Sequence, residues 1–227
     1  QQQKQTRRRR RRRSDNAEKQ AKEAQRKLFN DVHQAVVEKI QRGDLEGGIS
    51  VLEQFHQQHN SHADRQTYNT LLAAAVKVMN KQVVERIREY FNLYSIAYDS
   101  VSFLALLTWF GKTNQLNEVE KLWHTLTTRN PHHLSGKIIG IMATIIRKHK
   151  LGKEKLNEIT NVANHYDLKL TAQGYRDLFI AYKEFNDLEA YTSLYAKYMA
   201  ALYRHEVEEH PHIWQHTIMM YALHRPS

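Results

Sequence analysis

A period of 35 residues is the feature that most constrains how this chain of 227 residues can fold. Apolar or ring-bearing side chains recur at this interval, and they form columns in a self-alignment. The first column contains His33, Tyr68, Phe103 and Ile138, and the column four residues later contains Val37, Leu72, Leu107 and Met142. Two further units follow with some slippage, and they place Tyr175 and Trp214 in the first column. Such a period is typical of repeat proteins, in which each unit packs mainly against its neighbours.

Each unit divides into two halves that both carry apolar residues at helical spacing, and neither half alternates like a strand. Polar turns separate the halves: RGDLEG at 42–47, KTNQLN at 112–117, KHKLGK at 148–153 and EFNDLE at 184–189. The equivalent turn of the 65–99 unit, VMNKQV, is only moderately polar. Because the chain has only 8 Gly and 3 Pro, few residues interrupt its helices. We therefore predict helical hairpins that bury their apolar faces by stacking.

The predicted fold class is an all-α solenoid of about five helical hairpins with a basic N-terminal extension. Residues 14–29 are predicted as a separate leading helix, with Ser14 as its N-cap. The solenoid itself is expected over residues 30–227. Its predicted parts are hairpins at about 30–64, 65–99, 100–134, 135–171 and 172–210 and a capping helix at 211–223.

Most of the net charge of +10 lies in the first 13 residues, QQQKQTRRRRRRR, which contain no acid. Without their eight cations, 26 basic residues remain against 24 acidic ones, a net charge of about +2. A block of like charge repels itself and attracts a polyanion, so this tail is predicted to bind RNA without reading its sequence. A nuclear-localisation patch, a transit-peptide remnant and a solvated disordered tail are the alternatives. The predicted RNA-binding residues of the tail are Lys4, Arg7, Arg8, Arg9, Arg10, Arg11, Arg12 and Arg13.

Several classes of site are disfavoured by the composition and the spacing of residues. The absence of Cys excludes disulfides, iron–sulfur clusters and thiolate zinc sites, and no apolar run is long enough to span a bilayer. The His-rich segment at 205–216 lacks a metalloprotease spacing, and no catalytic constellation or phosphate loop occurs. We expect no enzymatic activity, cofactor, metal, small-molecule substrate or membrane partner. Because the chain begins with Gln, we also expect a processed or trimmed product.

Three stretches carry a resemblance to a known family: TYNTLL, VSFLALLTWFGKTNQLNEVEKLWHTL and YRDLFIAYKEFNDLEAYTSLYAKYM. They resemble pentatricopeptide repeat (PPR) proteins, and the resemblance covers roughly residues 30–223. The tetratricopeptide pattern is absent. The resemblance implies a right-handed solenoid and an organellar RNA-binding protein in which each repeat reads one base.

The resemblance also implies which side chains contact a base, namely the residue after the first-helix aromatic and the last residue of the unit. In the 65–99 unit these are Asn69 and Asp99, the family's uridine-favouring pair. Asn69 could instead bond local backbone, and Asp64 and Asp99 could be helix N-caps. The other units keep the pattern poorly, so serial base reading is predicted to be lost. Their pairs are Gln34 with Asp64, Leu104 with Leu134, Ile139 with Thr171 and Arg176 with His210.

A column of cations is better kept than the base-reading positions, since Arg42, Lys77, Lys112 and Arg147 are each 35 residues apart. The resemblance implies that this position approaches the RNA backbone. These cations could equally oppose the helix dipole at helix C-termini. In the fifth unit the position holds Glu184, next to Lys183.

Together these features predict a structural, RNA-associated protein, a component of a mitochondrial ribosome located in the matrix. Its expected partners are rRNA, bound by the tail, and neighbouring ribonucleoprotein subunits or RNA, bound by the solenoid. One alternative is a free organellar factor for RNA stability or translation, and the organelle could be the chloroplast. Another alternative is a protein–protein scaffold.

Overall fold

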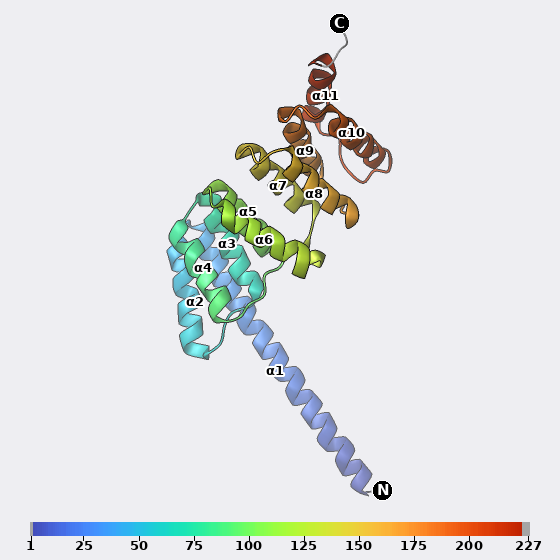
Figure 1. Cartoon of the computed structure of the whole chain (residues 1–227). Coiled ribbons are helices and arrows are strands. Elements are labelled where there is room, and N and C mark those ends of the chain that lie inside the picture. Colours follow the sequence, from blue (N-terminus) through green and yellow to red (C-terminus); the bar gives the residue numbers. More distant parts are fainter. Residues whose placement is uncertain (1, 224–227) are drawn as a thin grey trace. The chain divides into compact units, whose positions relative to one another are not determined.

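In the computed structural model, the backbone is described for residues 2–223 and the side chains for residues 18–220. Over the described backbone the chain forms eleven α-helices and one short 3-10 helix, with no strand (Figure 1). The predicted all-α fold is therefore confirmed. The helices group into two compact units, Gln1–Ala97 and Tyr98–Ser227.

The first unit contains α1 (Gln2–Gln41), α2 (Leu45–His59), α3 (Arg65–Val78) and α4 (Lys81–Leu93). The C-terminal part of α1 packs against α2 and α3, and α3 pairs with α4. The N-terminal part of α1 extends beyond these helices (Figure 1). Because no Gly or Pro precedes Gly43, α1 runs without a break through the segments predicted as tail, leading helix and first repeat helix.

The second unit contains a row of first helices, α5 (Ser100–Lys112), α7 (Gly136–Lys148), α9 (Ala172–Glu184) and α11 (Pro211–Leu223). Each of these packs against the next one in the row. The second helices α6 (Leu116–Arg129), α8 (Lys153–His165) and α10 (Leu188–Tyr203) pack against α5, α7 and α9 respectively. The 3-10 turn η1 (Pro131–His133) follows α6.

Short polar residues and left-handed backbone positions set the helix boundaries. Gly43 adopts φ 76° after α1, and Asp44 then caps α2 by accepting a hydrogen bond from the backbone N–H of Gly47 at 2.8 Å. The moderately polar turn between α3 and α4 works in the same way, because Met79 is left-handed and Asn80 accepts from Val83 N at 3.1 Å. The turns therefore occur where the polar motifs predict them.

The repeat columns form the cores of the units. Tyr68, Phe103 and Ile138 are buried, as are Leu72 and Leu107 four residues after the first two. His33 occupies the same column on α1, and its Nδ1 lies 3.2 Å from Thr67 Oγ1 on α3. The 35-residue period thus corresponds to equivalent packing positions within each unit.

Glycines bring α7 and α9 close together in the second unit. A Cβ atom on Gly140 would lie 3.1 Å from the Cα of Gly174 on α9, and one on Gly136 would clash with the carbonyl oxygen of Lys169, just before α9. Neither helix position could therefore carry a side chain without displacing its neighbour. Only the missing Cβ atoms allow the two backbones to approach this closely.

Candidate nucleic-acid interface

The arginine run lies in the N-terminal part of α1, where the backbone of residues 2–13 is helical. The side chains of Lys4 and Arg7 to Arg13 fall outside the described side chains, so their contact with RNA stays a prediction. Two lysines of the exposed segment that follows are paired with acids. Lys22 pairs with Glu18 at 2.6 Å and Lys19 with Glu23 at 4.0 Å, both one helical turn apart.

In the first unit, the cation column places Arg42 just after the end of α1 and Lys77 in the last turn of α3. Both side chains are exposed, and neither has a carboxylate within 4.0 Å among the side chains described. The nearby Lys39 differs, because it pairs with Asp44 at 3.0 Å. Arg42 and Lys77 therefore have positive charge that is not neutralised by a direct partner and that a phosphate can use.

In the second unit, the column places Lys112 at the end of α5 and Arg147 in the last turn of α7. Lys112 is exposed and has no carboxylate partner among the described side chains. Arg147 instead donates to Glu184 Oε1 of α9 at 2.9 Å. Glu184 is the residue that replaces the cation in the fifth unit, so this acid neutralises the preceding unit's cation. The sequence alone showed Glu184 as a gap in the column and gave no sign of this pair.

The predicted base-reading pair lies in two different units, and each member has a local environment of its own. Asn69, near the start of α3, is 5% exposed. Asp99 is the N-cap of α5, where its carboxylate accepts from Val101 N and Ser102 N at 3.0 Å each. Asp64 caps α3 in the same way, accepting from Thr67 N at 2.9 Å. The capping alternative is therefore present for both acids, and a base contact by Asn69 and Asp99 stays a prediction.

The fifth-unit position Arg176 is accompanied by an acid that sequence reasoning missed. Asp177, its immediate neighbour, is half-buried, and its Oδ1 accepts from Gln173 Nε2 at 2.7 Å. Burial raises the pKa of this carboxyl. Burial and the nearby Arg176 both lower the pKa of His210, so that imidazole favours its neutral form. The local charge is therefore mixed, and this position lacks the uniform positive field that a phosphate requires.

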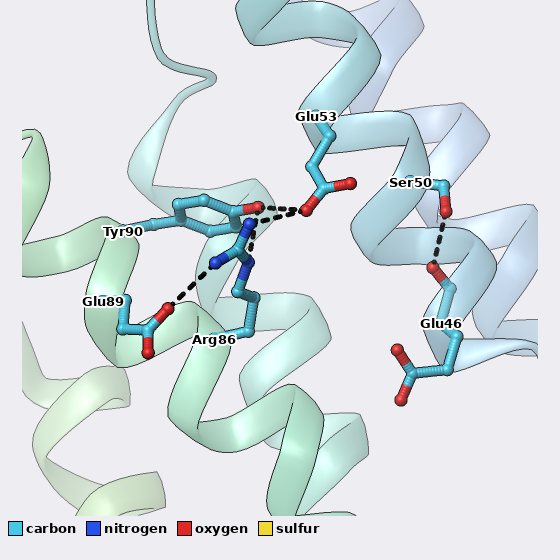
Figure 2. A network of polar contacts seen from close by, with 6 residues as sticks. All are labelled: Glu46, Ser50, Glu53, Arg86, Glu89 and Tyr90. Atoms are coloured by element: carbon cyan, nitrogen blue, oxygen red, sulfur yellow. Dashed lines mark hydrogen bonds and ion pairs between the residues drawn. The ribbon is translucent and has the colours of Figure 1, made fainter.

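A polar network on α2 and α4 distinguishes the second-helix side of the first unit (Figure 2). Arg86 donates to Glu53 at 3.0 Å and to Glu89 at 3.1 Å, and the Tyr90 hydroxyl also donates to Glu53 at 3.0 Å. Hydrogen bonds from Arg86 and Tyr90 lower the pKa of Glu53, while burial raises the pKa of Tyr90 to about 12. Two carboxylates surround one guanidinium, so this network offers a phosphate no net positive charge. Lys81, at the start of α4, is exposed and has no carboxylate partner among the described side chains, so unpaired cations are not confined to the first-helix column.

A cavity of about 720 Å³ in the second unit lies between α8 and α10. Its lining charges nearly cancel, since Lys169, Lys197 and Arg204 face Asp167 and Glu206. Lys169 and Arg204 both pair with Glu206, at 3.8 and 2.9 Å. The cavity thus lacks the charge that would favour nucleic acid. Among the described side chains, no group of three or more potential metal ligands converges.

Comparison with solved structures identifies the architecture. The chain is similar to the crystal structure of the pentatricopeptide repeat protein PPR10 from maize, with a TM-score of 0.60 and 14% identity over 87% of this chain. The chain has a PPR-like helical-repeat fold. It also matches PPR10 in complex with an 18-nt psaJ RNA element, with a TM-score of 0.57 and 14% identity over 85% of this chain.

The PPR-like chain covers 28% and 27% of those two structures, a little more than a quarter of their length. No protein-family model and no curated protein sequence matches it. Among the described helices of the PPR-like fold, none combines the length and hydropathy needed to cross a membrane.

Proposed function

We propose that this protein is a non-catalytic, RNA-associated structural component of a mitochondrial ribosome in the matrix. One observation carries the proposal: a PPR-like repeat fold is joined, through the single helix α1, to a run of seven arginines. The tail binds rRNA phosphates, while the repeats bind neighbouring RNA or proteins. A polycation of this density binds RNA by releasing counterions, whatever the base sequence.

The proposed RNA contacts within the repeats are electrostatic. Arg42, Lys77 and Lys112 approach phosphates, and their lack of a carboxylate partner among the described side chains supports this role. Arg147 contributes less because Glu184 neutralises it. A single uridine contact by Asn69 and Asp99 would be too little to select a target sequence.

A free organellar RNA-stability or translation factor is the second candidate, in mitochondria or chloroplasts. The similarity to PPR10, which was solved with an 18-nt RNA, favours it. In this case single-stranded RNA would bind to the cation column without a ribosome.

Sedimentation of organelle extracts separates the two candidates. A ribosomal component co-migrates with one subunit in high salt, and a free factor stays at the top of the gradient.

RNA binding is measured in parallel with a variant in which Arg7 to Arg13 are all replaced by Gln. The matched control replaces Lys19 and Lys22, which pair with acids on α1. We expect loss of binding in the first variant alone. Unchanged assembly in a variant that no longer binds RNA would indicate a protein–protein scaffold.

A further inference from the structure

One side of α11, the last helix of the second unit, is buried, and another side is exposed to solvent. Ile213, Thr217 and Met220 pack toward α9 and are 6% exposed or less. Thr217 also bonds to the buried Tyr191 hydroxyl at 3.0 Å. Ile218, one residue further along the helix, is 69% exposed. Two large apolar side chains, Ile218 and the 50% exposed Met219, therefore face solvent on a helix whose other side is buried.

The repeat shows that this exposure is unusual for the position. Trp214 begins the final unit in the column of Tyr175, and Ile218 follows it by four residues. Its equivalents in the other units are thus the residues of the second apolar column. Leu72, Leu107, Met142 and Phe179 are buried, at 0%, 0%, 6% and 0% exposure, and Val37 on α1 is half-buried. At 69% exposure, Ile218 is the one member of this column, among the described side chains, that is exposed.

Ring contacts show what buries Phe179 of this column. The ring of Phe179 lies 4.8 Å from that of Tyr191 and 6.0 Å from that of Tyr198, both on α10. In the first unit, Tyr68 of the preceding column lies 5.9 Å from Phe91 on α4. In both units the cover is the second helix of the same hairpin. The exposed side of α11 is therefore the place where a second helix would pack.

We propose that the Ile218 face of α11 binds an amphipathic α-helix of a partner protein, seated as a second helix is seated in the other units. The inference does not depend on RNA binding. In the other units, first helices pack against second helices, and the bound helix would continue this interface. It must therefore carry a stripe of apolar residues spaced i, i+3 and i+7. Three second helices bury this pattern: Val84, Ile87 and Phe91; Leu156, Ile159 and Ala163; Tyr191, Leu194 and Tyr198.

The face suits a helix of protein better than RNA. Ile218 and the half-buried Trp214 are apolar, and the indole N–H of Trp214 is already donated to Glu209. A phosphate would gain no donor from Ile218 and would approach the Glu209 carboxylate. Burying Ile218 under a helix instead removes apolar surface from water, which is the main source of affinity in helix-in-groove recognition.

The test titrates the 227-residue chain, labelled with carbon-13 at isoleucine δ1 methyls, with a synthetic peptide of residues 187–204. This peptide carries the α10 stripe and its Asp187 cap. We expect the Ile218 methyl resonance to shift and saturate. Fluorescence anisotropy of the labelled peptide should show at least tenfold weaker binding to Ile218→Glu. The matched control, Val101→Glu, changes another exposed residue on a first helix and should stay within twofold.

Peptide controls and folding controls make the result decisive. A peptide with Leu194→Asp and Tyr198→Asp should not bind, because its stripe is broken. The protein variant should keep its circular dichroism spectrum and Tm, since Ile218 is exposed; Ile218→Ala, a milder change, should weaken binding at least threefold. Absence of saturable binding, or equal affinity for Ile218→Glu, would overturn the proposal. The proposal would also be overturned if the peptide failed to bind while Ile218→Glu abolished either self-association of the chain or its binding to RNA.

Discussion

Glu184 controls the charge that Arg147 offers to a ligand. The two side chains come from neighbouring first helices and meet at 2.9 Å, so a phosphate would have to compete with a carboxylate for the guanidinium. The pair is partly exposed, which limits its contribution to stability. Its main effect is therefore on the electrostatic field of α7 and α9.

Removing that carboxylate should strengthen RNA binding. We expect Glu184→Gln to tighten binding of a single-stranded RNA about twofold in low salt, or about 0.4 kcal/mol, because Arg147 becomes available to phosphate. Glu120→Gln removes the same charge from α6, where Glu120 pairs with Lys155, and should leave the affinity unchanged. Filter binding measures both variants. Equal gains in the two would mean that only net charge matters.

His56 gives the first unit a dependence of stability on pH. Its Nε2 lies 2.8 Å from the Tyr68 hydroxyl, and burial lowers its pKa from the usual 6.5. The unfolded chain therefore binds a proton at a pH where the folded chain does not. Stability is fully present above pH 6.5 and falls as the pH drops below 6.5 toward the folded pKa.

Replacing His56 should flatten this dependence. One proton changes the unfolding free energy by at most about 1.4 kcal/mol per pH unit, and His56→Gln removes that contribution. The measurement is urea denaturation followed by circular dichroism between pH 5 and pH 7. These values bracket the unfolded pKa of about 6.5. His210→Gln, in the second unit, is the comparison because burial also lowers the pKa of His210. If the His56 variant kept the wild-type slope, this residue would not be the source.

Among the elements, α7 and α9 depend most on small residues. Ala is normally a better helix former than Gly, by about 1 kcal/mol. At Gly136 the sign should reverse, because the new Cβ would meet the carbonyl oxygen of Lys169, a backbone atom that cannot rotate away.

We expect Gly136→Ala to destabilise the second unit by about 2 kcal/mol through overpacking. The exposed Lys137→Ala on the same helix should change stability little. All three tryptophans, at 109, 123 and 214, lie in the second unit, so tryptophan fluorescence during urea unfolding reports on it directly. A stabilising effect of Gly136→Ala would show that the helices can separate at no cost.

The elements also show how far the sequence could predict the structure. The columns and turns followed from local rules, because Tyr68 and Leu72 share a helix face and Asp44 is a good N-cap. The unbroken α1 was not predicted, because charge repulsion within the arginine run argues against a helix there. The run contains no helix breaker, however, and the helix continues through it. The Arg147–Glu184 pair and the burial of Asn69 depend on how separate helices pack, which residue spacing alone does not specify.

For the whole molecule, the salt dependence of RNA binding should reveal where the affinity originates. If the eight tail cations contact single-stranded RNA, deleting residues 1–13 should reduce the slope of log affinity against log salt by about 6. Replacing Arg42, Lys77 and Lys112 together should reduce it by about 2. Binding isotherms across a range of salt concentrations measure both changes. A larger loss from the second variant would place the main contact on the repeats.

The continuity of α1 has a mechanical consequence. An α-helix rises about 1.5 Å per residue, so Arg7 and Arg13 stand roughly 33 and 24 Å along the axis from Phe29, where α1 meets the ring of Phe55 on α2. If α1 acts as a rigid rod, the arginine run at its N-terminal end would bind a polyanion at a fixed distance from the rest of the first unit. Inserting four residues into the rod would then displace the RNA footprint by about 6 Å and leave the fold of that unit intact.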